Sequence, residues 1–412
     1  MIERELLPSS WTIVPLRRVL RKVERPVPDG SGIVTAYRSG KVGLRSATRE
    51  EGYTLSEAET GYQGVERGDL VFHALDGFAG AVGVSDAAGR CTPVYHVCEP
   101  FLGDDPRFIA FSLRAMGSTG FLAVQAGNVR QRSVDFRAWD AFAQIPFPRP
   151  PISCERAIAD SLDAETRRID LLIEKKRRLA ASLEAWFVSR IAHEFGVDSR
   201  VASSSWETAV SATWPTAALR RYARIVNGGT PSAEEDYWNG NVVWVTPEDL
   251  SDDPLEINES RRTLTALGVA SSSATAIPTG SIVISTRAPI GSLGIAEVPV
   301  AFNQGCRGIR PSAALDSRFL LFQLMLARPY LDSLGNGTTF KELSASALGA
   351  ARIAVPPLPQ QIEIRRRLMT AHRVTSDARA RLSRQIDLLR ERRQALITAA
   401  VTGQLDVAKA AA

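Results

Sequence analysis

The tract Asn227-Gly228-Gly229-Thr230 brings backbone amide groups and very small side chains together. Two consecutive glycines let the backbone approach another molecule closely, and their amides can donate to a phosphate or to the edge of a base. The same four residues also suit a structural turn in which a glycine takes a positive φ. The sequence gives these two interpretations equal weight.

Side chains that hydrogen-bond to bases follow in the same half of the chain. Arg287 could bind guanine through both arms of its guanidinium, or it could form a structural salt bridge. Asn303 and Gln304 could read adenine, although buried amides that hold a loop explain them equally well. Arg307 and Lys341 are candidate phosphate contacts, but most surface cations are only solvated.

The first half of the chain holds two smaller basic groups. Arg38, Lys41 and Arg45 are spaced along a predicted β-hairpin, and Arg130 and Arg132 form a second group. Both groups could contact the phosphates of DNA, and both fit an ordinary protein surface equally well. The net charge of +5 and the pI of about 9.1 are compatible with a polyanionic partner without requiring one.

No spacing of residues indicates catalysis or a metal centre. The four histidines are scattered, and the four cysteines form no CxxC pair, which favours reduced, buried thiols in a cytoplasmic protein. The N-terminus has no secretory pattern, and no apolar stretch approaches the length of about 18 residues that a membrane span needs. We therefore expect a cytoplasmic protein that makes no contact with a membrane.

Two long segments with helical periodicity must position the candidate groups. They run from about residue 154 to 194 and from about residue 360 to 401, and each follows a cluster of prolines. A helix of about 40 residues is about 60 Å long and cannot bury its apolar stripe in a small domain, so the two segments are predicted to pair. The apolar residues to which we assign partner contacts are Leu162, Ile169, Leu183, Leu368, Leu382 and Leu389.

The segments that precede the two helices resemble each other. Gly68 to Phe72 matches Gly280 to Ile284, and each reads as a turn followed by a buried strand. This repeat predicts an α+β protein with two similar globular domains, separated and followed by long helices that pair as an antiparallel, pseudo-twofold coiled coil. The predicted ranges are 1–150 for the first domain, 151–200 for the central spacer helix, 201–355 for the second domain and 356–412 for the C-terminal spacer helix.

The second domain also contains an ordered set of short motifs. They are Tyr222–Ser232, Tyr237–Gly240, Val243–Leu250, Ser285–Gly291, Asn303–Gly308 and Gly337–Leu343. In this order, and followed by Pro356–Gln361 and Arg392–Gly403, they resemble the specificity subunits of type I restriction-modification systems. The likeness covers nearly the whole chain, and it is weaker in the first domain, where Val94 before Tyr95 departs from the family pattern.

The resemblance implies a non-catalytic subunit that binds double-stranded DNA. Each globular domain would be a target-recognition domain that reads one half of a bipartite site, and the helices would space the two domains. The helices would also dock two methyltransferase (modification) subunits, and restriction (motor and nuclease) subunits would join the full complex. S-adenosylmethionine, ATP and Mg²⁺ are expected on those partner subunits and none of them on this chain.

Three other functions are weighed against this one. A fused enzyme would need a glycine-rich cofactor loop or a phosphate-binding loop, and we find neither in the sequence. A stand-alone DNA-binding regulator would not need helices of this length. A purely structural coiled-coil adaptor would not need two large globular domains. The DNA target itself cannot be derived from these residues.

Overall fold

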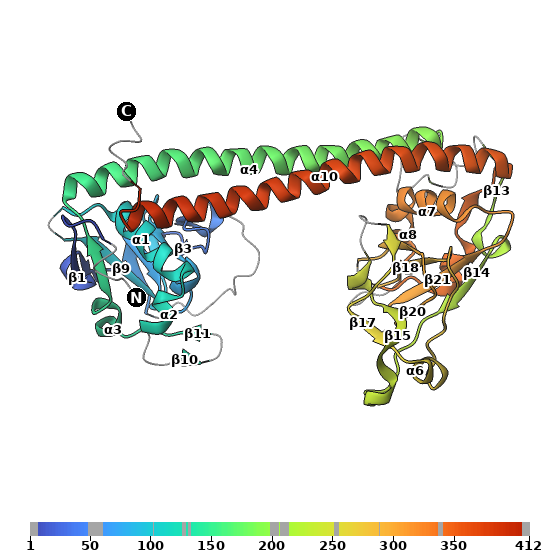
Figure 1. The fold of residues 1–412 in the computed structure, drawn as a ribbon, viewed down its shortest axis with the longest axis horizontal. Coiled ribbons are helices and arrows are strands. Elements are labelled where there is room, and N and C mark those ends of the chain that lie inside the picture. The colour runs from blue at the N-terminus through green and yellow to red at the C-terminus, as the bar shows by residue number, and fades with distance from the viewer. Residues whose placement is uncertain are drawn as a thin grey trace. The chain divides into compact units, whose positions relative to one another are not determined.

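The chain folds as two compact units in the computed structural model. Unit 1 comprises Met1–Lys175 and Gln385–Ala412, and unit 2 comprises Lys176–Arg384. Both units combine strands with helices, so the predicted α+β class is confirmed (Figure 1). The structure describes residues 7–47, 61–101, 103–125, 129–130, 133–197, 206, 214–250, 255–287, 289–336 and 341–405.

Unit 1 is built on a four-stranded antiparallel sheet with the strand order β2-β9-β6-β7. Its strands are β2 (Leu20–Lys22), β6 (Leu70–His73), β7 (Val82–Val84) and β9 (Tyr95–Pro100). Helix α1 (Pro106–Ser118) packs against β6 and β7, because Phe108, Ile109 and Leu113 on one of its faces are completely buried. A separate ladder joins β1 (Thr12–Pro15) to β12 (Pro146–Arg149).

Shorter elements complete the described part of unit 1. Two hairpins pair β3 (Val34–Ala36) with β4 (Val42–Leu44) and β10 (Val129–Arg130) with β11 (Ser133–Val134). A further antiparallel ladder pairs β5 (Gln63–Val65) with β8 (Gly89–Cys91). The short helices are α2 (Phe121–Gln125), α3 (Trp139–Ala143) and the 3-10 turns η2 (Leu16–Arg18), η3 (Arg45–Ala47) and η4 (Gly77–Ala79).

Unit 2 contains a five-stranded sheet with the order β14-β21-β18-β19-β16. Its strands are β14 (Ala223–Asn227), β16 (Glu256–Ile257), β18 (Ile282–Ser285), β19 (Leu293–Ala296) and β21 (Cys306–Pro311). A three-stranded sheet consists of β17 (Arg262–Leu264), β15 (Trp238–Val245) and β20 (Val300–Phe302), and a ladder pairs β13 (Thr216–Ala218) with β22 (Arg352–Ala354). The helices are α6 (Ala266–Ala270), α7 (Ser317–Leu326), α8 (Arg328–Ser333) and α9 (Ala345–Ala350), with 3-10 turns η5 (Leu219–Arg221), η6 (Glu235–Tyr237) and η7 (Pro247–Asp249).

The four strands of the main sheet in unit 1 correspond in order and register to β14, β21, β18 and β19 of unit 2. The equivalent Cα pairs are Leu70 with Val84 and Cys98 in unit 1, and Ile282 with Ile295 and Ile309 in unit 2. Gly68 and Gly280, each before the central strand, take positive φ values of 98° and 80°, a conformation that a residue with a Cβ rarely adopts. The predicted internal repeat is therefore confirmed at the level of backbone pairing.

In unit 1, the first part of helix α4 (Ile152–Glu194) lies beside the last part of α10 (Leu358–Val401). Leu162 belongs to the same core cluster as Val401, and farther along α4 Asp170 Oδ1 lies 3.1 Å from Arg393 Nε. Residue numbers rise along α4 as they fall along α10, so the two segments are antiparallel.

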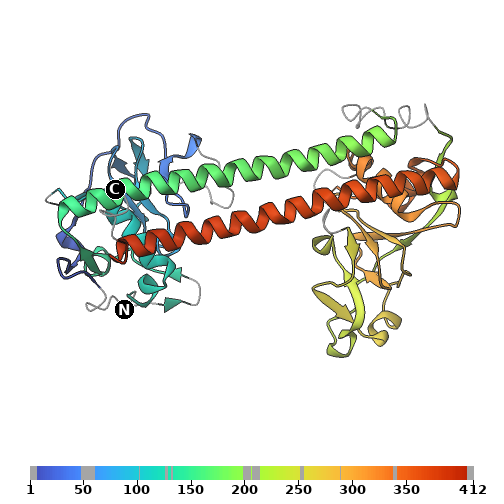
Figure 2. The same cartoon turned by 45° about the horizontal axis from the view of Figure 1, so that its top comes forward.

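The same two helices pair again in unit 2. The Phe187 and His372 rings are 5.3 Å apart, and Glu194 Oε2 lies 3.3 Å from Arg367 Nη1. Numbers again rise on one helix as they fall on the other, and Figures 1 and 2 both show the segments side by side. The predicted antiparallel pairing is confirmed within each unit.

The apolar residues that we assigned to partner contacts face inward. Leu162, Ile169 and Leu368 are only 1%, 3% and 0% exposed, and Leu183, Leu382 and Leu389 are half-buried. Leu162 and Leu368 join the core clusters of their own units. This assignment was wrong for the three buried residues, because the stripe is already covered by the other long helix and the adjoining globular part. The exposed apolar side chains of α4 are instead Leu171, Leu172, Leu179, Trp186 and Val188.

The two units do not coincide with the predicted domain ranges. Each unit takes a part of both long helices, so the boundaries at 175 and 384 fall inside helices. The four predicted ranges therefore stay a prediction. Among the described residues, no helix has the length and apolarity that crossing a bilayer requires.

Candidate nucleic-acid interface

The candidate residues of unit 2 gather at one edge of its main sheet. Strands β14 and β18 end at this edge, at Asn227 and Ser285, and β21 begins there at Cys306. The register places Asn227 opposite Arg307 and Ser285 opposite Cys306. Residues 227–230, 287, 303–307 and 341, which are separate in the sequence, thus lie around a single edge.

The glycine pair at this edge packs closely against two other segments of the chain. A Cβ on Gly228 would lie 2.0 Å from the carbonyl oxygen of Asn303, and one on Gly229 would lie 2.2 Å from Ser273 Oγ. The Gly229 amide donates to the carbonyl of Phe302 at 2.9 Å, so it is not available to a phosphate. Neither glycine has a positive φ. The turn interpretation was wrong in its φ, and close packing against the chain itself is what requires these glycines.

Next to the glycines, Thr230 and Gln304 form an exposed polar pair. The Thr230 hydroxyl donates to Gln304 Oε1, and both residues are exposed. Asn303 is held differently, because its Oδ1 accepts the amide of Gly305 at 3.0 Å. Asn303 therefore shapes the loop, while Gln304 is presented at the surface, and its reading of a base stays a prediction.

Three cations at the edge share two carboxylates. Glu342 accepts from Arg287 Nε at 3.2 Å and from Arg307 Nη2 at 3.3 Å, and Lys341 Nζ lies 2.6 Å from Asp332. The Arg307 side chain is 13% exposed and also donates to two backbone carbonyls, whereas the Arg287 side chain is 53% exposed. Arg307 thus has a structural role, and Arg287 is the better placed of the two arginines to meet a ligand.

A cleft of about 760 Å³ opens beside this edge. Its lining includes Trp244, Asp249, Arg261, Arg262, Pro289 and Asn303. Burial alone would raise the pKa of Asp249, but hydrogen bonds from Thr246 and Arg261 outweigh it and lower that pKa below its usual value. Asp249 therefore stays ionised and fixes the position of Arg261, whose Nε is 3.1 Å away.

Arg262 and two tryptophans in this region were not among the predicted contacts. The Arg262 guanidinium lies 3.5 Å from the centroid of the Trp238 ring, and Trp238 meets Trp244 edge to face at 5.0 Å. Cation–π stacking of this kind holds a guanidinium in place while its N–H groups stay able to donate. The tandem Arg261-Arg262 was visible in the sequence, but the pairing of Arg262 with Trp244 across two strands was not.

In unit 1, the predicted hairpin carries its three basic residues as expected. Arg38 and Lys41 lie in the turn between β3 and β4, and Arg45 follows β4. Arg38 pairs with Asp76 at 2.8 Å, Arg45 Nε donates to Thr35 Oγ1 at 3.2 Å, and Lys41 is exposed. Arg132 and the side chain of Arg130 lie outside the described residues, so these contacts stay predictions.

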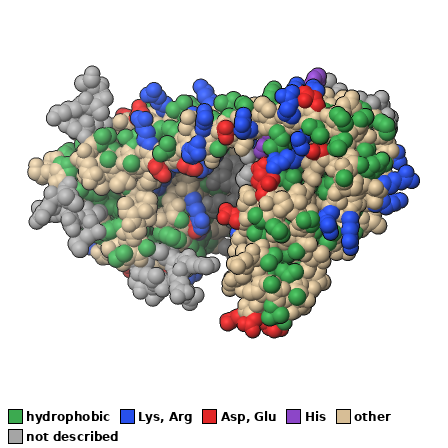
Figure 3. Space-filling model, turned by 45° about the vertical axis from the view of Figure 1, so that its right-hand side comes forward, with side chains coloured by type: hydrophobic (Ala, Val, Ile, Leu, Met, Phe, Trp, Pro, Cys, Tyr) green, Lys and Arg blue, Asp and Glu red, His purple; other side chains and the backbone are tan. Residues whose placement is uncertain are grey.

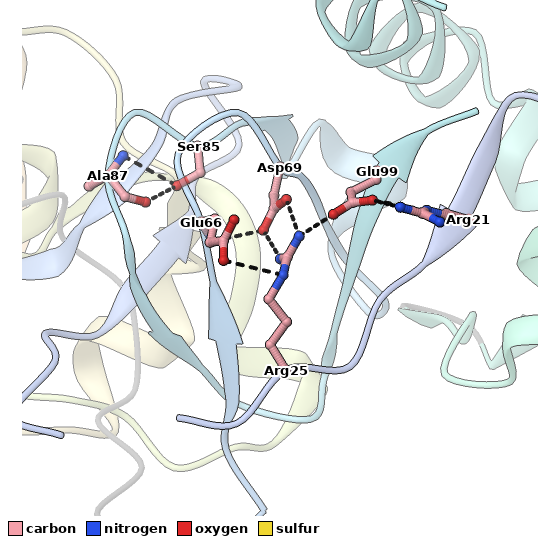
Figure 4. A network of polar contacts seen from close by, with 7 residues as sticks. All are labelled: Arg21, Arg25, Glu66, Asp69, Ser85, Ala87 and Glu99. Atoms are coloured by element: carbon pink, nitrogen blue, oxygen red, sulfur yellow. Dashed lines mark hydrogen bonds and ion pairs between the residues drawn. The ribbon is translucent and has the colours of Figure 1, made fainter. Parts of the chain in front are cut away.

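Other arginines of unit 1 are held in an ion-pair network. Figure 4 shows the Arg25 guanidinium between Asp69, Glu66 and Glu99, with Arg21 on the far side of Glu99. The Arg25 side chain is 19% exposed and that of Asp69 is 5% exposed. Because the partners lie on β2, on β9 and before β6, this network fastens three parts of the sheet together.

Groups suited to chemistry are few in the described part of the chain. No cluster of three or more histidine, cysteine or carboxylate side chains that could hold a metal ion occurs there. Burial raises the pKa of the Cys91 and Cys306 thiols to about 12, which keeps them protonated and unreactive. On the face shown in Figure 3, basic and acidic side chains are interspersed over the long helices.

The α+β fold of unit 2 thus presents guanidinium and amide groups at one sheet edge, where they could hydrogen-bond to a nucleic acid. Residues 213–387 match the family model described as the type I restriction modification DNA specificity domain. The resemblance predicted from the motifs of this segment is therefore confirmed there.

Individual relatives agree with this assignment. The chain is 33% identical over 171 residues to the type I restriction enzyme MjaIX specificity subunit of Methanocaldococcus jannaschii, which is 39% of this chain and 40% of that protein. It is 34% identical over 88 residues to the putative type I restriction enzyme MjaX specificity subunit of the same organism, or 21% of each chain. These alignments thus span less than half the length of either relative.

A solved structure resembles the fold over a longer range. It comes from a study of complex assembly and conformational transition of the type I R-M system. The likeness covers 97% of this chain and 99% of the other, with a TM-score of 0.69 and 20% sequence identity. This similarity concerns the fold, and it extends through both units.

Proposed function

We propose that this chain is the DNA-specificity subunit of a type I restriction-modification complex, in which each unit reads one half of a bipartite site in double-stranded DNA. The repeat carries the proposal: unit 2 contains a DNA specificity domain, and unit 1 repeats its main sheet in strand order and register. Two readers of one design on a single chain suit two half-sites. The chain itself performs no catalysis in this proposal.

The long helices would set the gap between the half-sites. Helices α4 and α10 have 43 and 44 residues, and each is therefore about 65 Å long. Half-sites on one face of B-DNA recur about every 34–36 Å, so rigid helices of this size can fix one spacing and exclude others. Inserting one helical turn into both helices should lengthen the unspecified gap in the recognised sequence.

The proposal assigns the chemistry to partner subunits. Two methyltransferase subunits would dock on the repeated helical surfaces, and restriction subunits would join the full complex. S-adenosylmethionine would be bound by the methyltransferases, and ATP with Mg²⁺ by the restriction subunits. Such a complex would act in the cytoplasm, where it has access to DNA.

Co-expression with a neighbouring methyltransferase in a host without other systems tests the proposal. Methylated bases are then mapped across the genome. A single split motif, with two short specified blocks around an unspecified gap, is expected. Exchanging residues 1–150 for those of a relative should change one block and leave the other unchanged.

Two outcomes contradict the proposal. If no complex forms with the methyltransferase, the helices have another role and a stand-alone DNA-binding regulator is favoured. If a complex forms but the exchange of residues 1–150 changes both blocks or neither, the units do not read separate half-sites.

A further inference from the structure

Arg114 of unit 1 is a half-buried cation without a counter-charge in contact. It lies on α1, and no hydrogen bond or ion pair involving its guanidinium occurs among the described residues. Burial, followed by the charge of Arg393, lowers its pKa to about 10, so it still carries its charge at neutral pH. A buried charge is costly unless an opposite charge compensates it, and this site therefore calls for an anion.

The backbone holds the Arg114 guanidinium in a defined place. A Cβ on Gly40 would lie 2.3 Å from Arg114 Nη1 and 2.4 Å from its Cζ, so the guanidinium rests directly on this glycine. Gly40 has a φ of +88° and belongs to the turn between β3 and β4. The turn fixes the position of the guanidinium without neutralising it.

The charges around Arg114 are mostly positive. Arg393 on α10 pairs with Asp170 on α4 at 3.1 Å, and Lys41 is exposed in the same turn as Gly40. Arg38 in this turn is paired with Asp76. Asp170 and Asp76 are thus each engaged by another arginine, and Arg114 and Lys41 are left with no carboxylate in contact among the described residues.

The site lies at the edge that corresponds to the candidate interface of unit 2. A Cβ on Gly80 would meet the carbonyl of Arg38 at 2.8 Å, so the β3–β4 turn packs on the connection between β6 and β7. The equivalent connection in unit 2, between β18 and β19, carries Arg287. The two units differ at the residue itself, because Arg107-Phe108 aligns with Arg318-Phe319 and Arg114 then falls on Met325.

We propose that Arg114, held against Gly40 beside Lys41, binds a phosphate of the DNA backbone and is a contact of unit 1 that unit 2 lacks. This inference rests on the proposed function and names one contact of the same interface. A fixed guanidinium that presents several N–H donors suits a phosphate, and backbone contacts add affinity without adding sequence preference.

The test compares the wild-type chain, in complex with its methyltransferase, with three variants. R114M installs the residue that unit 2 has at this position, R114K keeps the charge without the fork, and R137M is a matched control at an exposed arginine paired with Asp135. Binding is measured from low to high salt on a duplex carrying the methylated motif and on a scrambled duplex. Thermal unfolding of each variant is measured without DNA.

R114M is expected to weaken binding to both duplexes by a similar factor of about tenfold or more, the size of a charge-assisted hydrogen bond. The slope of log K against log salt should become shallower by about 0.9, the value for one lost phosphate contact. R114K should keep the slope, and R137M should match the wild type. R114M should also melt at the same temperature as the wild type or higher, because it removes an uncompensated charge.

Three results overturn the inference. An unchanged salt slope in R114M, with normal specific binding by the wild type, means that Arg114 touches no phosphate. A loss of methyltransferase assembly in R114M shows that the cation serves a protein contact. If the wild-type complex binds neither duplex, the proposed function fails and this inference fails with it.

Discussion

Helix α4 starts in unit 1 against buried charged groups, whereas α10 starts in unit 2 against apolar side chains and a neutral amide. The register of the repeat matches Asp104 with Leu315, Arg149 with Val355 and Glu155 with Gln361. In each unit, the aspartate that caps the shorter helix, Asp105 of α1 or Asp316 of α7, donates its backbone amide to the side chain of Glu155 or Gln361. The oxygen is Glu155 Oε2 for Asp105, at 2.9 Å, and Gln361 Oε1 for Asp316, at 2.8 Å.

We call the three residues at the start of each long helix its anchor. In unit 2 the polar atoms of the Gln361 side chain in this anchor all have hydrogen-bond partners. Gln361 is 0% exposed, and its Nε2 donates to the carbonyls of Ala314 at 3.0 Å and Pro356 at 2.8 Å. Leu315 is 3% exposed and belongs to the main core cluster, and Val355 packs against the same cluster. None of the three side chains Leu315, Val355 and Gln361 carries a charge.

In unit 1 the same frame holds three ionisable groups. Arg149 donates to both oxygens of Asp104, at 2.8 and 3.1 Å, and the Asp104 side chain is 0% exposed. Glu155 is also 0% exposed, and its Oε1 has no donor among the described residues. Burial, and then the charge of Asp104, raise the pKa of Glu155 to about 7. The same backbone arrangement thus accepts either a charged or a neutral set of side chains. Only the stability of the charged set depends on pH and on the presence of all three residues.

The largest effect is expected from removing the single cation of the charged anchor. R149V leaves Asp104 buried without a counter-charge, and breaking a buried ion pair in this way costs about 3–5 kcal/mol. Chemical unfolding of the full chain gives the loss, and hydrogen exchange of peptides containing Asp105 locates it in unit 1. R137A is the control, since its pair with Asp135 is exposed and should cost less than about 0.5 kcal/mol. Equal losses in the two variants would show that Arg149 compensates no buried charge.

A smaller, pH-dependent effect is expected from E155Q, which gives unit 1 the residue of unit 2. The pKa of Glu155 rises from 4.5 in the unfolded chain to about 7 in the folded one, so the folded state retains the proton longer. The contribution of Glu155 to the stability of the wild type is therefore complete below pH 4.5 and falls by up to about 3 kcal/mol as the pH rises to 7. Burial also raises the pKa of Asp104 and acts in the same direction.

E155Q should remove the part of this loss that Glu155 causes. The variant is expected to be more stable than the wild type at pH 8 and nearly equal to it at pH 4.5, as measured by unfolding curves at both values. The reciprocal variant Q361E should behave in the opposite way, because a carboxylate would face the carbonyls of Ala314 and Pro356. A constant difference between E155Q and wild type across this range would exclude titration of Glu155 as the cause.

The comparison is sharpened by exchanging the whole set. D104L/R149V/E155Q installs the anchor of unit 2 in unit 1, and replacing buried ion pairs by apolar residues is often neutral or stabilising by about 1–4 kcal/mol. The triple variant should thus recover the loss of R149V and show a flatter pH profile than the wild type. If it is as unstable as R149V alone, the backbone frames of the two units are less alike at this position than their register indicates.

Part of this architecture could be predicted from the sequence. Apolar periodicity gave both long helices to within two residues of their starts, and paired motifs such as those after Gly68 and Gly280 revealed the repeat. These signals are local, and a single segment carries each of them. Which surface an apolar stripe covers is not local, and for this reason Leu162 and Leu368 were assigned to a partner although their own units bury them.

The candidate site divides in the same way. The types of residue at the edge of unit 2 were visible, but their partners depend on strand register, which a single chain does not reveal. Glu342 was therefore missed as the carboxylate between Arg287 and Arg307. The sequence also left open whether the Gly229 amide donates to a ligand, and the structure shows that the carbonyl of Phe302 accepts from it. Arg114 was missed because its contact with Gly40, which lies in a turn far from it in the sequence, could not be predicted.

The smallest expected effects concern the arginines that hold the two capping aspartates. Arg365 Nη1 lies 2.7 Å from Asp316, whereas Arg107 meets Asp105 at 2.7 Å and also Asp160 and Asp163 on α4 at 2.8 and 2.9 Å. Both arginine side chains are more than a third exposed, so solvent screens these pairs. R365A should cost about 0.2–1 kcal/mol, and R107A should cost more because it releases three carboxylates.

High salt should reduce the difference in melting temperature between R107A and R365A. At about 1 M ionic strength the screening length falls to about 3 Å, and exposed pairs lose most of their attraction. Melting temperatures of R107A and R365A, each taken relative to the wild type, should therefore differ at low salt and converge at high salt. A gap that persists in 1 M salt would mean that Arg107 acts through the packing of its aliphatic stem, and the electrostatic contrast between the two caps would then be wrong.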